Sequence, residues 1–445
     1  MEPNCSVPYS EGIISLLDND IYKFTMHYAV LTHFPEVQVI YTMKNRTNHK
    51  KLSRVAFGWL EAQIMKLGNL SVSFEELQFL QSSIPNLSES YINFLQNYRL
   101  NPHEQITCSF IPDNEVNTSE DDMGEVELIV KGLWVETILY EIPLLALTSE
   151  AYFRFVDTDW SYDGQEERAY EKAMQLMKAG CVFSEFGTRR RRDYHTQALV
   201  LRGLLRAQKD GEEKSLPGKL SGTSNCHFAM RFGIPAEGTV GHEWFMGVAA
   251  ISNDYEAATI TALNYWMDCF DKDHLGYILT DTFGTPAFLR SFRLPSLRPT
   301  QEKFVESFNG VRQDSGDPVQ FVKLMKDFYE REDIKSRKTI VFSDSLNVKS
   351  CLEYKEIANE AGFDCKFGIG TFLTNDFVNQ KTGQKSAPLN IVIKLRSAGG
   401  NPAVKLSDSP TKNMGDQTTV EKVKKLLRYS QPEWKLGDEG KRWGS

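Results

Sequence analysis

The fold class of this chain follows from residues 309–347, which read NGVRQDSGDPVQFVKLMKDFYEREDIKSRKTIVFSDSLN. Two short apolar runs, each ending in polar residues, flank a segment with the spacing of an amphipathic helix. Asp317 is the expected N-cap of this helix, and Pro318 suits its first position. The order strand, helix, strand predicts one parallel βαβ unit.

The same alternation recurs from about residue 162 onward. The other apolar runs with polar ends are CVFSEFGTRRRR (181–192), KLSGTSN (219–225), PAEGTVGHEW (235–244), GYILTDTFGT (276–285) and CKFGIGTFLTND (365–376). Helices are expected in most of the gaps, including one over 162–180 that Gly180 ends and one that Asp254 opens. About seven such units predict an irregular (β/α) barrel, whose chemistry gathers at the carboxyl ends of its strands.

The two ends of the chain have a different pattern. QVIYTMKNR (38–46) and VELIVKGLW (126–134) predict strands, and FEELQFLQSSI (74–84) predicts a helix. LNIVIKLRSAGGNPAVKLSD (389–408) predicts a hairpin through two glycines that returns to the first domain. We therefore expect a discontinuous α+β domain from residues 1–150 and 385–445, beside an α/β barrel over 151–384 that holds the catalytic site.

Composition narrows the classes of function. The chain has 445 residues, 41% hydrophobic and 25% charged, as in globular proteins. A net charge of -8 argues against a nucleic-acid partner, and no apolar run reaches the roughly 20 residues of a membrane span. Seven cysteines without a CxxC pair, and no apolar signal core, indicate a reducing compartment. We expect a cytoplasmic protein and leave a nuclear fraction open.

Two clusters suit the binding of phosphates and sugars. Gly368, Gly370 and Thr371 lie at a strand-to-helix turn, where backbone N–H groups can cradle a phosphate; a purely structural turn explains two glycines equally well. Arg312 and Asp314 lie in RQDSG beside Gly316. The arginine suits a planar carboxylate, and the aspartate suits sugar hydroxyls or a metal held mainly by phosphates.

The run EFGTRRRR follows another strand. Phe186 can stack on an aromatic ligand. Consecutive residues of a helix point in different directions, so at most two of the four arginines can face one site. The others are expected to be solvated or to lie at a subunit contact.

His242 in GTVGHEW admits three interpretations: a structural residue, a metal ligand or a residue that does chemistry. Zinc is disfavoured, because the other histidines supply no spaced partner ligands. Asp281 follows another strand and is the natural carboxylate to accept from the imidazole and orient it. Glu243 has no assigned role; capping, pairing with an arginine and tuning of His242 all remain open.

Taken together, these clusters resemble the nicotinate phosphoribosyltransferases of the fungal type, within the type II phosphoribosyltransferases. The resemblance covers nearly the whole chain and rests on SLLDNDIYKFTMHYAV (15–30), TILYEIPLLALTSEAYFRF (137–155), FSEFGTRRRR, GTSN, GTVGHEWFMG, TDTFGT, VRQDSGDP, FSDSLN, FGIGTFLTND and NIVIKL. It implies an enzyme of NAD salvage that joins nicotinate to phosphoribosyl pyrophosphate, with Mg²⁺ and coupled ATP hydrolysis. Nicotinate mononucleotide and pyrophosphate would be the products.

The resemblance also implies residue roles. ATP would transiently phosphorylate His242, with Asp281 paired to it. Tyr22, accompanied by Asp20, would reach into the site of a partner subunit in a homodimer and, with Phe186, enclose the pyridine ring. The remaining implied contacts are Arg189 as a basic residue of the site, Arg312 and Asp314 near the base and ribose, Gly368 and Gly370 at the phosphate, and Ser343 and Asp344 beside that loop.

Ser224 bears on the choice of pyridine. Nicotinamide-using relatives carry an aspartate at the position of Ser224 in GTSN. A carboxylate there would repel nicotinate, whereas a hydroxyl does not, so serine favours the acid. A transferase for nicotinamide or quinolinate remains a competing hypothesis, as does a silent relative that binds pyridine nucleotides without catalysis.

Overall fold

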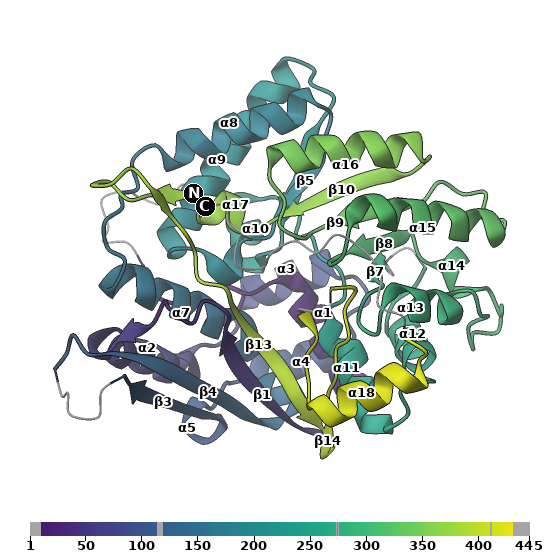
Figure 1. Ribbon diagram of the computed structural model, residues 1–445, viewed down its shortest axis with the longest axis horizontal. Coiled ribbons are helices and arrows are strands. Elements are labelled where there is room, and N and C mark those ends of the chain that lie inside the picture. The colour runs from purple at the N-terminus through teal and green to yellow at the C-terminus, as the bar shows by residue number, and fades with distance from the viewer. Residues whose placement is uncertain (1–9, 114–118, 273, 275, 410–411, 430–445) are drawn as a thin grey trace.

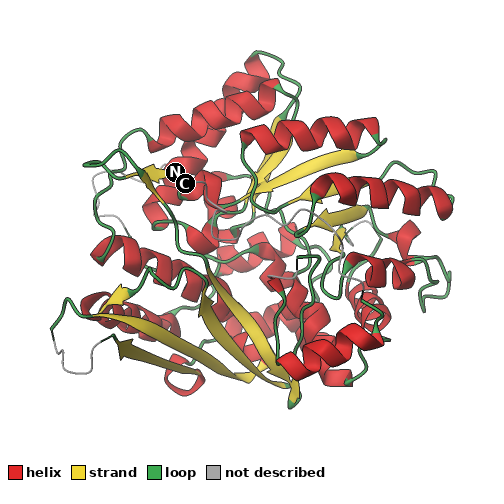
Figure 2. Cartoon of the chain, in the orientation of Figure 1, coloured by secondary structure: helices red, strands yellow, loops and turns green. Residues whose placement is uncertain are grey.

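The computed structural model of the chain describes residues 10–113, 119–272, 274, 276–409 and 412–429. The described residues form two six-stranded sheets, one two-stranded sheet and the helices around them (Figures 1 and 2). The larger unit contains a parallel sheet with the strand order β6-β5-β10-β9-β8-β7. These strands are β5 Val182–Glu185, β6 Lys219–Thr223, β7 Tyr277–Leu279, β8 Gly310–Gln313, β9 Thr339–Phe342 and β10 Asp364–Ile369.

Helices separate these parallel strands along the chain, as expected. They are α8 Gln165–Lys178, α9 Tyr194–Glu213, α10 Cys226–Phe232, α11 His242–Ser252, α12 Ala258–Cys269, α13 Thr285–Phe292, α14 Phe304–Ser307, α15 Pro318–Arg331, α16 Val348–Glu360 and α17 Thr371–Thr374. Asp317 caps α15 by accepting from Val319 N, and Gly180 ends α8 with a φ of 72°. The α12 helix begins at Ala258, because Asp254 instead caps the preceding turn through the N–H groups of 256 and 257.

The segment expected to form a seventh strand, 235–244, contains no strand. Its start lies along the end of β6, where Thr223 N donates to Pro235 O and Glu237 N donates to Thr223 O. Gly238 then packs so closely against Ile21 that a side chain at 238 would clash. Because α1 occupies this space, the segment turns directly into α11, and His242 begins a helix instead of following a strand.

The second sheet joins the two ends of the chain. Its strand order is β14-β13-β1-β4-β2, with β3 also paired to β4. These strands are β1 Gln38–Asn45, β2 Leu52–Ser53, β3 Ile106–Pro112, β4 Met123–Leu133, β13 Ile391–Ala398 and β14 Asn401–Pro402. The predicted hairpin is therefore present, and β13 runs antiparallel beside β1 from Val39 opposite Ala398 to Asn45 opposite Ile391 (Figure 1). The exact boundaries at 150 and 384 stay a prediction.

Helices of the first 155 residues pack around this sheet and against the parallel unit. They are α1 Ile21–His33, α2 Arg54–Lys66, α3 Phe74–Ser83, α4 Glu89–Asn97, α5 Pro102–Gln105, α6 Trp134–Thr137 and α7 Glu141–Phe155, with 3₁₀ turns at Leu67–Asn69 and Ile138–Tyr140. The remaining elements are a short pair, β11 Phe377–Val378 and β12 Lys385–Ser386, a 3₁₀ turn at Thr188–Arg190, and the late helix α18 Gln417–Leu426. Within the described part of the chain, no helix is long and apolar enough to cross a bilayer.

Large aromatic side chains join the two units. Trp134 of α6 and Trp244 of α11 are completely buried, with ring centroids 6.0 Å apart. Gly247 of α11 lies directly under the Trp134 ring, where any side chain would collide with the indole. The helix that begins at His242 is therefore held against the sheet formed by the chain ends.

Candidate active site

Predicted site residues, most of them polar, follow every strand of the parallel sheet at its carboxyl end, as the barrel prediction requires. They are Phe186 to Arg190 after β5, Ser224 after β6, Asp281 after β7, Asp314 after β8, Ser343 after β9 and Gly370 after β10. The segment 392–395, together with Lys405, Lys412 and Met414, lines the same cavities and closes the site from the side of the second sheet.

An outer cavity brings together most of the predicted phosphate and ribose contacts. Its lining includes Phe186, Arg189, Arg312, Asp314, Ser343, Gly368, Gly370 and Thr371. Gly368 is a packing requirement, because a side chain there would strike the Phe186 ring. With Arg46, Arg190, Lys405 and Lys412 also in the wall, the outer cavity is strongly cationic and suits phosphate groups.

An inner cavity adjoins the outer one and shares Arg189, Arg312 and Asp314 with it. Tyr22 and His242 line the inner cavity, and both belong to the same chain. Within the chain, α1 packs against the GTVGHEW segment, and Gly241 lies close to the Tyr22 ring. The expectation that Tyr22 serves a partner subunit's site stays a prediction.

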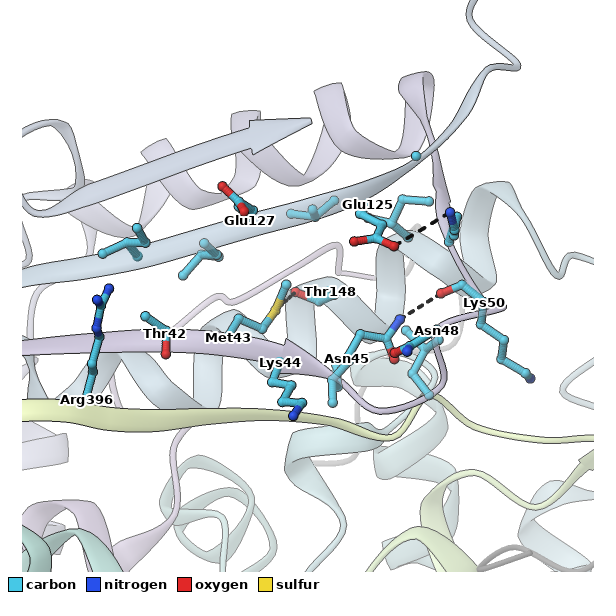
Figure 3. A pocket seen from close by; sticks show the side chains of 18 residues that line it. Thr42, Met43, Lys44, Asn45, Asn48, Lys50, Glu125, Glu127, Thr148 and Arg396 are labelled. Atoms are coloured by element: carbon cyan, nitrogen blue, oxygen red, sulfur yellow. Dashed lines mark hydrogen bonds and ion pairs between the residues drawn. The ribbon is translucent and has the colours of Figure 1, made fainter. Parts of the chain in front are cut away.

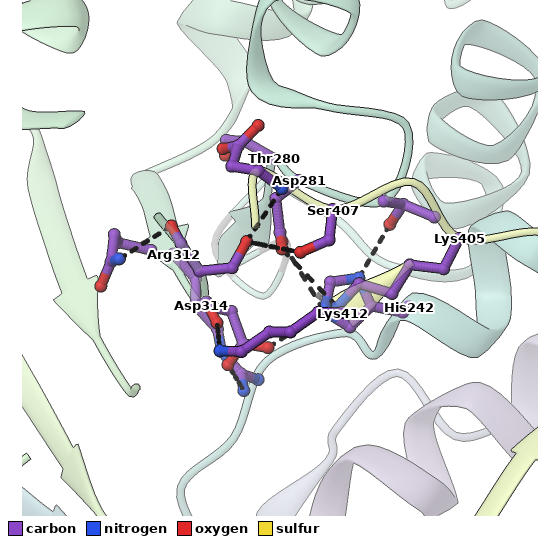
Figure 4. Close-up of polar contacts among 12 residues, drawn as sticks. His242, Thr280, Asp281, Arg312, Asp314, Lys405, Ser407 and Lys412 are labelled. Carbon is purple, nitrogen blue, oxygen red and sulfur yellow. Dashed lines mark hydrogen bonds and ion pairs between the residues drawn. The ribbon is translucent and has the colours of Figure 1, made fainter. Parts of the chain in front are cut away.

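His242 lies between three charged side chains and one hydroxyl (Figure 4). Nδ1 is 3.0 Å from Thr282 Oγ1, whereas Nε2 is 3.0 Å from Asp314 Oδ2 and 2.8 Å from Lys405 Nζ. Burial, followed by the charge of Lys405, lowers the pKa of His242 to about 4. The imidazole is thus neutral at pH 7, with one nitrogen able to act as a nucleophile.

The structure places two carboxylates beside His242, and the predicted partner is the more distant of them. Asp281 Oδ1 lies 3.6 Å from Nε2, beyond hydrogen-bond distance, and Asp281 instead accepts from Ser315 Oγ. Asp314 is the carboxylate that contacts the ring, and Thr282 contacts the other nitrogen. Because three separate strand ends converge here, spacing along the chain could not tell which aspartate approaches closer.

The same carboxylates bear on a metal site. One donor atom each from His242, Asp281 and Asp314 lies within 4.8 Å of the others. The Lys405 ammonium contacts this group, 3.6 Å from Asp281 Oδ2, and offsets part of its negative charge. Carboxylate oxygens suit Mg²⁺, which uses one or two of them together with substrate phosphates. Asp314, which also lines both cavities, therefore fits the predicted role.

The four arginines of 189–192 divide into two pairs. Arg189 and Arg190 line the outer cavity, in agreement with the limit of two. The others are neither solvated nor at a surface contact. Arg191 is fully buried and binds both oxygens of Asp18 at 2.8 and 2.7 Å, and buried Arg192 lies over the Phe153 ring. Burial requires these partners, so this pair is structural.

Three other predicted residues lie outside the two cavities. Ser224 is buried and donates to Asp20 Oδ1 at 2.7 Å. The carboxylate of Asp20 therefore lies beside Ser224, and burial raises the pKa of Asp20. Gly316 has a φ of 79° and donates to Ser409, as a turn residue, and Asp344 accepts from Lys412 Nζ. The specificity argument from Ser224 consequently loses its physical basis.

Glu243, which had no assigned role, holds α11 in place. Its carboxylate accepts hydrogen bonds from Lys23 Nζ, Tyr41 Oη and Trp134 Nε1, the last at 2.8 Å. Lys23 also forms an ion pair with Glu141 at 2.6 Å. These partners come from α1, β1 and α6, so Glu243 fixes the start of α11 and with it the neighbouring His242.

Three lysines from the end of the chain were missed. Lys394 lines both cavities, and Lys405 and Lys412 line the outer one. The signal was present in VIKLR and AVKLSD, where a cation interrupts a buried apolar run. Such a lysine needs an anionic partner or a cavity. The sequence predicted the backbone hairpin over 389–408 but assigned no role to the lysine side chains in it.

Another cavity, of about 360 Å³, lies in the second sheet (Figure 3). The β1–β4 pairing ends at Thr42 and Ile129, and the space opens between the diverging strands. None of the predicted site residues lines it. The chemistry therefore belongs to the strand ends and not to this opening.

The parallel fold, the cationic outer cavity and the neutral histidine define an α/β enzyme that acts on phosphate esters. Comparison with known families makes this more specific. Residues 17–149 match the model of the nicotinate phosphoribosyltransferase N-terminal domain, and residues 181–431 match the model of the nicotinate phosphoribosyltransferase family. The chain belongs to the nicotinate phosphoribosyltransferase family.

Similar proteins support this assignment. Nicotinate phosphoribosyltransferase of Saccharomyces cerevisiae is 46% identical, over 98% of this chain and 100% of that protein. The enzyme of Methanosarcina mazei is 38% identical, over 92% and 96%. The crystal structure of nicotinate phosphoribosyltransferase from Porphyromonas gingivalis has a TM-score of 0.80 at 31% identity, covering 94% of this chain and 100% of that one.

Proposed function

We propose that the chain transfers the phosphoribosyl group of phosphoribosyl pyrophosphate to nicotinate, coupled to ATP hydrolysis. The carrying observation is the pair of adjoining cavities, one cationic and one containing neutral His242, which share Arg189, Arg312 and Asp314. The family and the activities named for its similar members support the phosphoribosyl transfer to nicotinate.

In the transfer step the ribose C1–oxygen bond to pyrophosphate breaks, and a bond from C1 to the pyridine nitrogen forms. No proton has to move and no covalent enzyme–sugar bond is needed. The protein contributes orientation and charge stabilisation. Arg189 and Arg312 offer cations at the junction of the cavities, and Lys405 and Lys412 offer cations for the phosphates. Mg²⁺, held by the phosphates and Asp314, would neutralise the leaving pyrophosphate.

His242 is proposed to accept the γ-phosphoryl group of ATP on Nε2. The Lys405 ammonium can donate to Nε2 only when that nitrogen keeps its lone pair. In that tautomer Nδ1 carries the proton and donates to Thr282, while Asp314, 3.0 Å from Nε2, receives no proton from the ring and accepts from Arg312 instead. Nε2 then attacks phosphorus, the bond to the bridging oxygen breaks, and ADP leaves without a proton lost from Nε2. The new dianion lies beside Lys405, which can stabilise it.

The test is a product assay with nicotinate, phosphoribosyl pyrophosphate and Mg²⁺, with and without ATP. We expect nicotinate mononucleotide in both cases, faster with ATP, and acid-labile phosphate on the enzyme. His242→Ala should remove ATP hydrolysis, the labelled phosphate and the stimulation by ATP, while slow uncoupled transfer continues. ATP coupling that survives in this variant would show that another residue accepts the phosphate. Parallel assays with nicotinamide and quinolinate test the competing substrates.

A further inference from the structure

Lys394 differs from the other cations of the site, because its ammonium meets no protein partner among the residues that the structure describes. β13 places it between Ile393 and Leu395, in the wall shared by the outer and inner cavities. By contrast, Arg312 binds Asp314, Lys405 contacts His242 and Lys412 binds Asp344. Within the described ranges, no hydrogen bond or ion pair involves the Lys394 ammonium.

The charges around Lys394 leave room for an added anion. Burial, then Lys405, lowers the pKa of Lys394 to about 7; Arg189 and Arg46 act in the same direction, and Glu141 opposes them. Glu141 is already engaged by Lys23 at 2.6 Å. A half-buried ammonium that lies among other cations and has no anionic partner within the described residues is costly, and a bound anion would reduce that cost.

The walls of the inner cavity suit an aromatic acid. Tyr22, Met246, Ile393 and Leu395 supply apolar surface, and Lys394 stands at its border with the cationic outer cavity. A flat ring can lie against the apolar side chains while its carboxylate meets the ammonium. A phosphate, in contrast, would find more N–H donors in the outer cavity.

Arg312, the expected carboxylate ligand, is already committed to protein partners. Its Nε donates to Ser343 at 2.8 Å and its Nη2 donates to Asp314 at 2.7 Å. These two hydrogen bonds occupy the Nε/Nη2 edge of the guanidinium, which is the edge that can bind a carboxylate bidentately. Nη1 donates to a third partner, Thr239 Oγ1. Lys394, whose ammonium makes no hydrogen bond or ion pair within the described residues, can bind a carboxylate in its place.

We propose that Lys394 binds the carboxylate of the acidic pyridine substrate and thereby selects the acid over the amide. This inference rests on the proposed function and makes it more specific. An amide brings no charge to satisfy the ammonium, so the unpaired cation persists and binding is weaker. Selection by a cation at 394 takes the place of the argument based on Ser224.

Steady-state kinetics of Lys394→Met test the assignment. We expect the KM for nicotinate to rise about tenfold to hundredfold, as for loss of one hydrogen bond to a charged group. The KM for phosphoribosyl pyrophosphate should stay within about twofold, and turnover of nicotinamide should not fall. Lys394→Arg, which keeps the charge, should restore most of the affinity. Lys44→Met, at an exposed lysine of the adjacent strand β1, is the matched control and should behave like the wild type.

Titration calorimetry with nicotinate gives an independent readout. A carboxylate beside Lys394 would raise its pKa above 7, so binding should take up a proton near pH 8. Affinity should be full below pH 7 and weaken by about tenfold per pH unit above it, until the pKa of the complex is reached. In Lys394→Met this dependence should be absent, which separates Lys394 from the other titrating groups.

Two results would overturn the inference. A Lys394→Met variant that loses affinity for phosphoribosyl pyrophosphate but keeps its KM for nicotinate would make Lys394 a phosphate ligand. Unchanged kinetics for both substrates would make it a residue without a binding role. Failure of the proposed function would be visible earlier, as a wild-type enzyme that forms no product from nicotinate, and the inference would fall with it.

Discussion

At the scale of single residues, charge pairing explains which side chains build the site and which support it. Asp314 illustrates this: burial alone would raise its pKa, but the positive charges of Arg312 and Lys405 hold the pKa well below the usual value. The carboxylate is therefore ionised throughout the physiological range, beside a neutral imidazole. Asp314, which contacts both Arg312 and His242, therefore lines both cavities.

Glu243 provides a residue-scale prediction. Glu243→Ala removes the common acceptor of Lys23, Tyr41 and Trp134 and should lower the free energy of unfolding by about 3 kcal/mol. Lys23 keeps Glu141 as a partner, which limits the loss. Urea denaturation followed by tryptophan fluorescence measures the change. The exposed Glu353→Ala on α16 should alter stability by less than about 0.5 kcal/mol, and an equal effect in both variants would refute the anchoring role.

The sequence predicts which residue types line the site, but not which side chains contact each other. It placed Phe186, Arg189 and Arg312 in the site, and they do line the outer cavity. It paired His242 with Asp281, although Asp314 lies closer. The strand ends determine which residues reach the site. Asp314 lies 3.0 Å and Asp281 lies 3.6 Å from His242 Nε2, and this difference depends on tertiary packing, which the spacing along the chain does not specify.

At the scale of elements, α11 connects the reactive histidine to the rest of the molecule. Its first residue is His242, and its Gly247 lies under the Trp134 ring. The helix was expected to start after a strand, but 235–240 is displaced by α1 and makes only a short backbone contact with β6. A contact between residues more than 200 positions apart cannot be read from local periodicity.

Two glycine substitutions test this packing. Gly247→Ala should destabilise the protein by about 1–3 kcal/mol, because the new methyl group collides with a fully buried indole. It should also slow catalysis, since α11 shifts at His242. Gly58→Ala on α2, where a side chain meets nothing within 4 Å, should instead stabilise by about 0.5–1 kcal/mol through helix propensity. Thermal denaturation of both variants distinguishes overpacking from a general effect of alanine; stabilisation of both would contradict the predicted clash.

At the scale of the whole molecule, the site exists only where the two units meet. The parallel sheet supplies Arg312 and Asp314, and the second sheet and the segment after it supply Lys394 and Lys405. Neither unit alone carries both the phosphate-binding cations and His242 with its partners. The buried tryptophans at 134 and 244 show that this contact is part of the core.

This shared core predicts a single cooperative unfolding transition. Leu60→Ala in α2 and Ile340→Ala in β9 remove fully buried side chains from different units and should each cost about 2–5 kcal/mol. Both variants should shift the same transition, with far-UV circular dichroism and tryptophan fluorescence giving coincident midpoints. Separate transitions, each sensitive to only one of the substitutions, would show that the units unfold independently.

The sequence by itself determined the βαβ alternation, the return of the last strand to the first domain, and the residue types at the strand ends. These follow from local hydrophobic periodicity and turn chemistry, which act over a few residues. Only the tertiary structure decided that Arg191 is buried on Asp18, that Tyr22 and His242 line one cavity, and that the Lys394 ammonium meets no partner among the described residues. Burial and ion pairing depend on distances across the whole fold, so the chemistry of each charge became fixed only when the two ends of the chain came together.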